Sequence, residues 1–467
     1  MSCGGWVRVC TDAEEYHERC HQRGWNMTCY GLDLATAHPL TLPLLQKALE
    51  HLYRFRYYDC ASKGMKGKLW FRELDTFSPD LEVLKGVKFK TAMLSLAHSK
   101  YNVEDGPLWR VRLLPFYEDE EKSMPEMQKD FPYYYHLIFA AHHSIVDGFT
   151  NVKICNLLHK LIDDLMSGIP INDSNQLGCI ISENEIKRLL KRAKCELTEN
   201  PELLHNVSED ILGSGKRVSQ LMKAYPVEED AVPNSNMILI EDLNKDITKL
   251  FIAACKNNSV SIHSALSTIF NCVVIQMLKS AGINDEFYNI RSSHDINYRR
   301  YSEDNSSCIL GCHVGALRPN FLLSKDTEEH FWDVARNFHN DFHTKLESNY
   351  PFFETVLEDL KRDEIMDSSK FGHVLGLPWI TFYITNMGNL ATVLPGEGTN
   401  VQIVQFRRFG TVHKPNMIIC NFVHTFRGRL SITTGYNTQR INKETAQKIL
   451  DQVFVRVKQV SYHGGLV

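Results

Sequence analysis

The alternation of hydrophobic and polar residues along the chain predicts a mixed α/β protein. Residues 133–141 form an aromatic and aliphatic run typical of a buried strand, and residues 149–166 place their apolar side chains on one helical face. The segment 133–166 therefore predicts a strand, a sharp loop and a helix in immediate succession. Further helices are expected at 43–55, 261–279, 332–346 and 443–460, and further strands at 108–115, 237–240, 378–384, 416–423 and 429–436.

Two segments stand apart from this strand and helix pattern. Residues 291–307 are rich in charge and serine, and we interpret them as a loop. Charged residues also dominate from about 182 to 234, including a basic cluster at 187–194. Such a cluster is typical of the solvated face of a helix, or alternatively of a localisation or nucleic-acid patch. We predict an N-terminal lobe at 1–181, a charged, partly helical linker at 182–235 and a C-terminal lobe at 236–467.

Composition narrows the class of protein. Of 467 residues, 43% are hydrophobic and 23% are charged, and the formal net charge is −4. These proportions are those of a packed globular protein and exclude wholesale disorder. A dedicated nucleic-acid binder usually carries a basic domain, and the basic cluster lacks interleaved aromatic residues. We therefore expect no nucleic-acid partner. No repeat of fixed period is present, which excludes solenoids and propellers.

Cysteine usage and apolar runs bear on the compartment. The 13 cysteines are odd in number and include no Cys-x-x-Cys pair, which favours reduced thiols in a cytoplasmic protein. The N-terminus has no signal-peptide pattern. The most apolar run, 262–278, contains His263, Asn271 and Gln276, so we expect a buried helix and no stable membrane insertion. We expect a monomer.

One segment indicates chemistry, at His142-His143-Ser144-Ile145-Val146-Asp147-Gly148. Histidine is the side chain best suited to proton exchange near pH 7. The Asp could fix the loop or hold a histidine tautomer, and the Gly allows close backbone approach or a positive φ. If the strand persists, the two histidines face opposite ways, and only one can enter a given pocket. The alternatives are a structural histidine cluster and an ordinary Asp-Gly turn.

A metal site is a weaker interpretation of the same residues. Cys308, Cys312 and His313 lie close together in sequence, but no matching second pair accompanies them. A His-x-x-x-His pair on a helix is absent, and no third ligand is indicated for the two histidines. We therefore expect no metal.

The segment 142–148 resembles the His-His-x-x-x-Asp-Gly signature of the CoA-dependent acyltransferase superfamily. That superfamily includes peptide-synthetase condensation domains, BAHD acyltransferases, alcohol acetyltransferases and chloramphenicol acetyltransferase. Four other segments resemble family motifs: 52–56 the first motif without its His, 105–112 the Gly-Pro-Leu-x-Arg strand, 296–300 an Arg-bearing segment, and 385–388 a Ser-Asn-x-Gly stretch. An Asp-Phe-Gly-Trp-Gly motif is absent, which disfavours a plant-type BAHD enzyme. No carrier or adenylation segment fits, which disfavours a peptide-synthetase module.

The resemblance implies two chloramphenicol-acetyltransferase-like α/β sandwich lobes with an active-site tunnel between them. It also implies a ternary complex without an acyl-enzyme. His143 would act as general base on an acceptor hydroxyl or amine as that group attacks the thioester of acyl-CoA. Asp147 would be architectural and pair with Arg299. His142 would be structural, and Gly148 would support the loop.

Other roles implied by the resemblance are less specific. Asn386 would orient an oxyanion or a substrate carbonyl, unless it is a simple turn residue. Arg407 and Arg408, after an apolar strand, would bind the CoA phosphates, unless they are a solvated surface pair. The expected reaction is transfer of a short acyl group to a small hydrophobic alcohol or natural product, and acetyl is the acyl group that we expect. The alternatives are an N-acyltransferase or amide-forming condensation enzyme, and a non-catalytic condensation-like binding protein. The presence of both His143 and Asp147 argues against the last.

Overall fold

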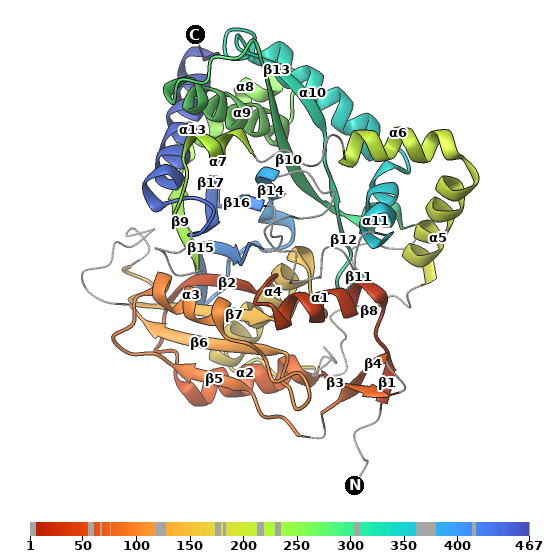
Figure 1. The fold of residues 1–467 in the computed structure, drawn as a ribbon. Helices are drawn as coiled ribbons and strands as arrows, with labels where there is room; N and C mark the ends of the chain where they lie inside the picture. The colour runs from red at the N-terminus through yellow and green to blue at the C-terminus, as the bar shows by residue number, and fades with distance from the viewer. Residues whose placement is uncertain are drawn as a thin grey trace. The chain divides into compact units, whose positions relative to one another are not determined.

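Strand, loop and helix follow one another at 133–166 as the sequence predicts. Strand β7 spans Tyr133–Ala141 and helix α4 spans Gly148–Met166 (Figure 1). The computed structural model describes residues 6–54, 60–65, 68–74, 76–116, 128–172, 179–180, 184–212, 219–228, 235–302, 309–360, 380–412 and 417–466. The expected motif residues Phe55 and Arg56, and also Cys308, lie outside these ranges.

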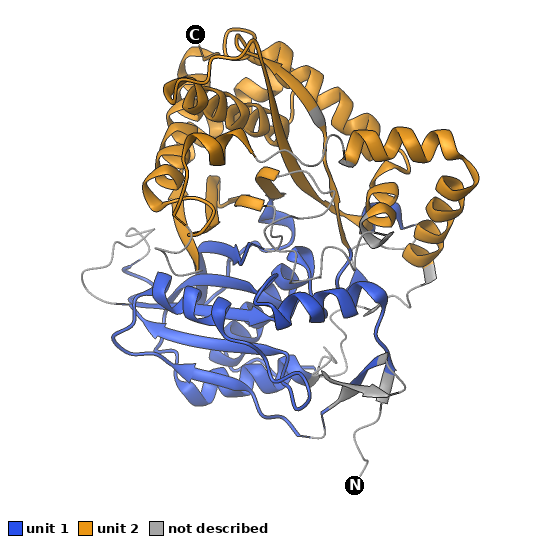
Figure 2. Cartoon of the chain, in the orientation of Figure 1, with its two compact units in different colours: residues 1–183, 299–313, 389–413 blue, residues 184–298, 314–388, 414–467 orange. Residues whose placement is uncertain are grey.

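The chain forms two structural units, and neither is continuous in sequence (Figure 2). Unit 1 comprises residues 1–183, 299–313 and 389–413. Unit 2 comprises residues 184–298, 314–388 and 414–467. Two short segments from the second half of the chain, 299–313 and 389–413, thus belong to the same unit as residues 142–148. Arg299 lies in unit 1, although the sequence division placed it in the C-terminal lobe.

Unit 1 is built on a five-stranded sheet in the order β15-β2-β7-β6-β5. Its strands are β2 (Thr28–Thr36), β5 (Asp80–Val83), β6 (Trp109–Pro115), β7 and β15 (Val401–Gly410). Only the β5–β6 pair is parallel. The unit also contains α1 (Asp12–Gln22), α2 (Leu42–Arg54), α3 (Phe89–His98), the small strands β1 (Trp6–Val9), β3 (Cys60–Met65), β4 (Lys68–Glu73), β8 (Cys179–Ile180) and β11 (Ile309–Leu310), and the 3-10 turn η6 (Leu390–Thr392).

The centre of this sheet determines where the two histidines lie. Strand β7 is hydrogen-bonded on both edges, to β2 and to β6, and its last residue Ala141 pairs with Thr28 and with Trp109. Its side chains are buried from Leu137 to Ala141, which explains the unbroken apolar run. The backbone N–H of His142 continues the ladder by donating to Leu108 O at 2.8 Å. The histidines therefore begin a short loop at the end of a central, rigid strand.

Unit 2 contains a seven-stranded sheet whose main path is β12-β10-β14-β16-β17-β9, with β13 paired to β10. Its strands are β9 (Asn236–Asp242), β10 (Phe287–Asn297), β12 (Val314–Leu317), β13 (Asn320–Ser324), β14 (Ile380–Asn389), β16 (Met417–Phe426) and β17 (Arg429–Asn437). Its helices are α5 (Asn184–Glu199), α6 (Pro201–Leu212), α7 (Gln220–Ala224), α8 (Lys245–Asn257), α9 (Ile262–Ser280), α10 (Phe331–Leu346), α11 (Tyr350–Leu360) and α13 (Lys443–His463). The 3-10 turn η3 (Tyr298–Tyr301) follows β10. Helices α5, α6 and α7 fall in the segment predicted as partly helical.

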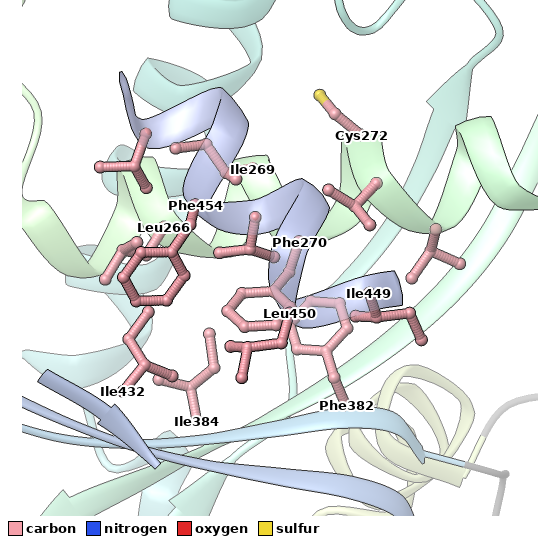
Figure 3. Close-up of a cluster of buried hydrophobic side chains, with 14 of the residues drawn as sticks. Leu266, Ile269, Phe270, Cys272, Phe382, Ile384, Ile432, Ile449, Leu450 and Phe454 are labelled. Atoms are coloured by element: carbon pink, nitrogen blue, oxygen red, sulfur yellow. The ribbon is translucent and has the colours of Figure 1, made fainter. Parts of the chain in front are cut away.

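Helices α9 and α13 pack on the sheet and form the core of unit 2 (Figure 3). Phe270 of α9 stacks on Phe382 of β14 with ring centroids 5.3 Å apart. Helix α9 is long and apolar enough to cross a membrane, but 78% of its most apolar window is buried inside the protein. Its composition is therefore explained by its place in the core, as expected for the run 262–278.

The prediction of a loop at 291–307 is wrong for residues 291–297. Residues up to Asn297 belong to strand β10, which pairs with β12, β13 and β14. The polar residues Ser292, Ser293 and His294 are buried in this strand. Because the buried face is polar here, hydrophobic periodicity gave no strand signal.

The half-buried His263 and the buried His294 of unit 2 predict a loss of stability in acid. The rings of His263 and His294 meet edge to face at 4.8 Å beside Phe342. Burial lowers the pKa of His263 from 6.5 to about 4, and burial also lowers the pKa of His294. The unfolded chain therefore binds more protons, so stability is complete above pH 6.5 and falls as the pH decreases toward 4. His263 alone contributes about 3 kcal/mol to this loss, at about 1.4 kcal/mol per pH unit.

Urea unfolding of the wild type and of His263→Phe at pH 7 and pH 4 measures this contribution. We expect the wild type to lose more stability than the variant between the two pH values. Equal losses would show that His263 does not remain neutral in the folded protein.

Candidate active site

Asp147 is fully buried and holds the loop after β7 against two other segments. Its Oδ1 accepts the backbone N–H of Thr150 at 2.9 Å and so caps helix α4. Its Oδ2 accepts from Arg299 Nη1 at 2.5 Å and from the backbone N–H of His313 at 2.8 Å. Burial alone would raise the pKa of Asp147, but the Arg299 guanidinium outweighs burial and lowers it. Both carboxylate oxygens are thus committed within unit 1, and the expected Asp147–Arg299 pair is present.

Arg299 is also satisfied at each of its nitrogens. Besides Asp147, it donates from Nε to Ile309 O at 2.7 Å and from Nη2 to Thr150 Oγ1 and Gly311 O, both at 2.9 Å. Its guanidinium carbon lies 4.9 Å from the centroid of the Phe149 ring. The fixed fork of an arginine suits such a set of planar contacts. The result is that residues 309–313 are tied to the loop that carries His143.

His142 points into the interior and contacts helix α1. Its Nδ1 accepts the backbone N–H of Ser144 at 3.1 Å, so the proton of the neutral ring lies on Nε2. This Nε2 lies 3.0 Å from Glu18 Oε2. Likewise, His21 Nε2 accepts the backbone N–H of Tyr101 at 2.8 Å, and its Nδ1 lies 3.7 Å from the same carboxylate oxygen. Two neutral imidazoles therefore lie beside one buried glutamate.

The same hydrogen bonds decide whether these residues could hold a metal. A neutral imidazole has one nitrogen lone pair, and a metal ligand must offer it to the ion. In His21 and in His142 that lone pair already accepts a backbone N–H. Burial lowers the pKa of His142, in keeping with a neutral ring. Glu18, His21 and His142 thus lie together in one buried cluster, and the structural role of His142 stays a prediction.

Glu18→Gln is expected to destabilise the protein by about 1.5–3 kcal/mol, because it removes the charge from a buried, hydrogen-bonded carboxylate. Burial would raise the pKa of Glu18, but His142 and His21 lower it from 4.5 to about 2. The contribution is therefore complete above pH 4.5 and is lost as the pH falls toward 2. Denaturant unfolding at pH 7 and pH 3 measures it. Glu202→Gln, at an exposed position, is the matched control, and equal midpoints for the two variants would contradict this role.

His143 faces a different set of side chains. Its ring stacks on the ring of His17, with centroids 4.2 Å apart and planes inclined by 3°. Its Nδ1 lies 3.5 Å from Cys312 Sγ, and His17 Nε2 lies 3.3 Å from the same sulfur. His143 and Cys312 are half-buried, whereas His17 is buried. Of the two adjacent histidines, only His143 is thus partly exposed.

Helix α1 supplies three of these side chains and was missed by the sequence analysis. A capping box begins it, in which Glu14 N–H donates to Thr11 Oγ1 at 3.1 Å and Thr11 N–H donates to Glu14 Oε2 at 2.7 Å. Its buried face is polar, so no apolar rhythm marks it. The Thr-x-x-Glu cap and the His-x-x-x-His spacing of His17 and His21 were the available signals. The prediction that no His-x-x-x-His pair lies on a helix is therefore wrong, because His17 and His21 both lie on α1, although their rings contact different partners.

The remaining predicted residues have simpler surroundings. Gly148 begins α4 and does not adopt a positive φ, so its conformational freedom is not required. In unit 2, Asn386 Oδ1 accepts the N–H of Gly388 at 2.8 Å, which is a turn contact. Arg407 and Arg408 lie within β15, not after it, and alternate between its faces. Arg408 is buried and Arg407 is half-buried, so they do not form an exposed pair.

Comparison with known proteins identifies the fold of the chain that carries this site. No protein family model matches the chain, and no curated sequence matches it. Solved structures do match. The trichothecene 15-O-acetyltransferase TRI3 from Fusarium sporotrichioides has a TM-score of 0.69 at 14% identity, over 97% of this chain and 94% of that one. The first condensation domain of the CDA synthetase has a TM-score of 0.69 at 11% identity, over 98% and 97%. The epimerization domain of tyrocidine synthetase B has a TM-score of 0.63 at 14% identity, over 99% and 97%.

The chain has the two-lobe α/β fold of condensation and acetyltransferase domains. At these identities the similarity establishes the fold and not the activity. Within this fold, the half-buried His143 and the buried Asp147–Arg299 pair are the features that bear on chemistry. His17 and Cys312 lie against His143, whereas Glu18 and His21 lie against His142.

Proposed function

We propose that this protein is a CoA-dependent acyltransferase. It would move a short acyl group from acyl-CoA to the hydroxyl of a small hydrophobic alcohol or natural product. Acetyl is the acyl group that we expect. The observation that carries this proposal is the half-buried His143, placed at the end of β7 in an acetyltransferase and condensation fold. Three of the neighbours with this fold are an acetyltransferase, a condensation domain and an epimerization domain.

In this mechanism the acceptor and the donor are bound together. His143 removes the proton of the acceptor hydroxyl as its oxygen attacks the thioester carbonyl carbon. The bond from that carbon to the CoA sulfur then breaks, and His143 returns the proton to the leaving thiolate. Because Nδ1 contacts Cys312, we assign the proton transfer to Nε2. General-base assistance contributes roughly 10²–10⁴-fold, and holding both substrates together removes the entropy cost of a bimolecular encounter.

Asp147 has a structural part in this proposal. Its two oxygens accept hydrogen bonds from Thr150, Arg299 and His313, so neither is assigned to the substrate. It fixes the loop and thereby the position of the His143 ring. Of the two arginines on β15, the half-buried Arg407 stays a candidate contact for the CoA phosphates.

The acceptor class is decided by experiment. The purified protein is incubated with acyl-CoAs of graded chain length and with mixtures of alcohols or of amines, and free thiol is measured. We expect thiol release that depends on an alcohol and is fastest with a short acyl chain. Release that depends only on amines would replace this proposal with an N-acyltransferase. No release with any donor would favour a carrier-bound donor or a binding protein and would contradict the proposal.

A further inference from the structure

A thiol lies beside the two stacked imidazoles of unit 1. Cys312 Sγ is 3.3 Å from His17 Nε2 and 3.5 Å from His143 Nδ1. On the far side of His17, Asn26 Nδ2 is 3.2 Å from Nδ1. His17 and Asn26 are buried, whereas Cys312 is half-buried and can be reached from outside. The order Cys312, His17, Asn26 is thus that of a thiol, an imidazole and a side chain that orients the imidazole.

A hydrogen-bond donor directed at a thiol is one way to activate a cysteine nucleophile. With Nδ1 accepting from the Asn26 amide, neutral His17 carries its proton on Nε2 and directs it at the sulfur. A donor aimed at sulfur stabilises the thiolate over the thiol. In the tautomer that the proposed mechanism uses, His143 carries its proton on Nδ1, the second ring nitrogen at this sulfur. Two imidazole N–H groups thus stabilise the thiolate.

His17, His143 and Cys312 would have to be arranged differently to chelate a metal. Their ligand atoms lie within 4.8 Å of one another, which satisfies the distance requirement. An imidazole nitrogen, however, directs its lone pair in the plane of its ring. The planes of His17 and His143 are parallel within 3° and their centroids are 4.2 Å apart, so the two planes do not meet at one ion. The geometry favours hydrogen bonding to the thiol over chelation.

We propose that Cys312 is an activated thiol and a covalent modification site for soft carbon electrophiles. In the reaction with iodoacetamide, the sulfur attacks the carbon that bears iodine, a C–S bond forms, and the C–I bond breaks with loss of iodide. The thiol proton goes to water. The product places an amide-bearing group next to His143. Loss of acyl transfer on modification would follow only if the proposed function holds, whereas the modification itself does not depend on it.

The test uses other cysteines of the same chain as references. The full-length protein is treated with substoichiometric iodoacetamide at pH 7, and labelling of each cysteine is followed over time by peptide mass spectrometry. Cys195 is exposed, and Cys155 and Cys272 are buried. We expect Cys312 to be labelled at least about tenfold faster than Cys195, since thiolate content sets the rate. Cys155 and Cys272 should stay unlabelled. Labelling of Cys312 no faster than that of Cys195 would overturn the proposal.

A variant separates activation by His17 from simple accessibility. His17→Gln is expected to lower the labelling rate of Cys312 at least about tenfold while leaving Cys195 unchanged. Continued protection of Cys155 and Cys272 shows that the variant is folded. If His17→Gln unfolds the protein, Asn26→Ala provides the same comparison with a smaller expected decrease. An unchanged Cys312 rate in a folded His17→Gln protein would contradict activation.

Discussion

Asp147→Ala is expected to destabilise unit 1 by about 3–5 kcal/mol, because it leaves the buried guanidinium of Arg299 without its counter-ion. It also removes the cap of α4 and the acceptor of the His313 N–H. Arg299→Ala should cost a similar amount. The midpoint of denaturant unfolding, followed by a probe in unit 1, measures both effects.

A double-mutant cycle identifies the pair as the cause. If Asp147 and Arg299 act on each other, the double variant should be destabilised by less than the sum of the two single variants. Asp164→Ala on the same helix, at a half-buried position, is the matched control and should change the midpoint little. Unchanged midpoints for both single variants would contradict the architectural role of Asp147.

His143→Ala should lower the rate of acyl transfer by roughly 10²–10⁴-fold, which is the range that a general base contributes. Because the ring of His143 is only half-buried, the expected loss of stability is smaller than that of Asp147→Ala. His205→Ala, at an exposed position on α6, is the control for general effects of losing a histidine. Added imidazole should restore part of the activity of His143→Ala and none to a protein inactivated by unfolding. If His143→Ala is as active as the wild type and added imidazole does not change its activity, His143 is not the general base.

Hydrophobic periodicity predicted elements whose buried faces are apolar. Strand β7 and helices α4, α9, α10 and α13 are close to their predicted bounds for this reason. It did not predict elements whose buried faces are polar. Helix α1 buries Glu14, His17, Glu18 and His21, and β10 buries Ser292 and His294, so neither carried an apolar rhythm.

The site was predictable only where a motif marks it. The signature at 142–148 and its resemblance to known acyltransferases indicated His143, Asp147 and the partner Arg299. Nothing in the sequence links Cys312 to His143, because 169 residues separate them and the contact exists only in the folded chain. The sequence also did not show that unit 1 is discontinuous, because segments 299–313 and 389–413 join it only through tertiary contacts.

We propose that His143 acts as the general base while an acyl group passes from CoA to an acceptor hydroxyl. The most direct measurement compares free CoA and acylated acceptor, both quantified by mass spectrometry, for the wild type and for His143→Ala at equal folded concentration. We predict equal amounts of the two products from the wild type, and at least a hundredfold less of both from the variant. Equal product formation by the two proteins, or CoA release by the wild type without acylated acceptor, would contradict the account.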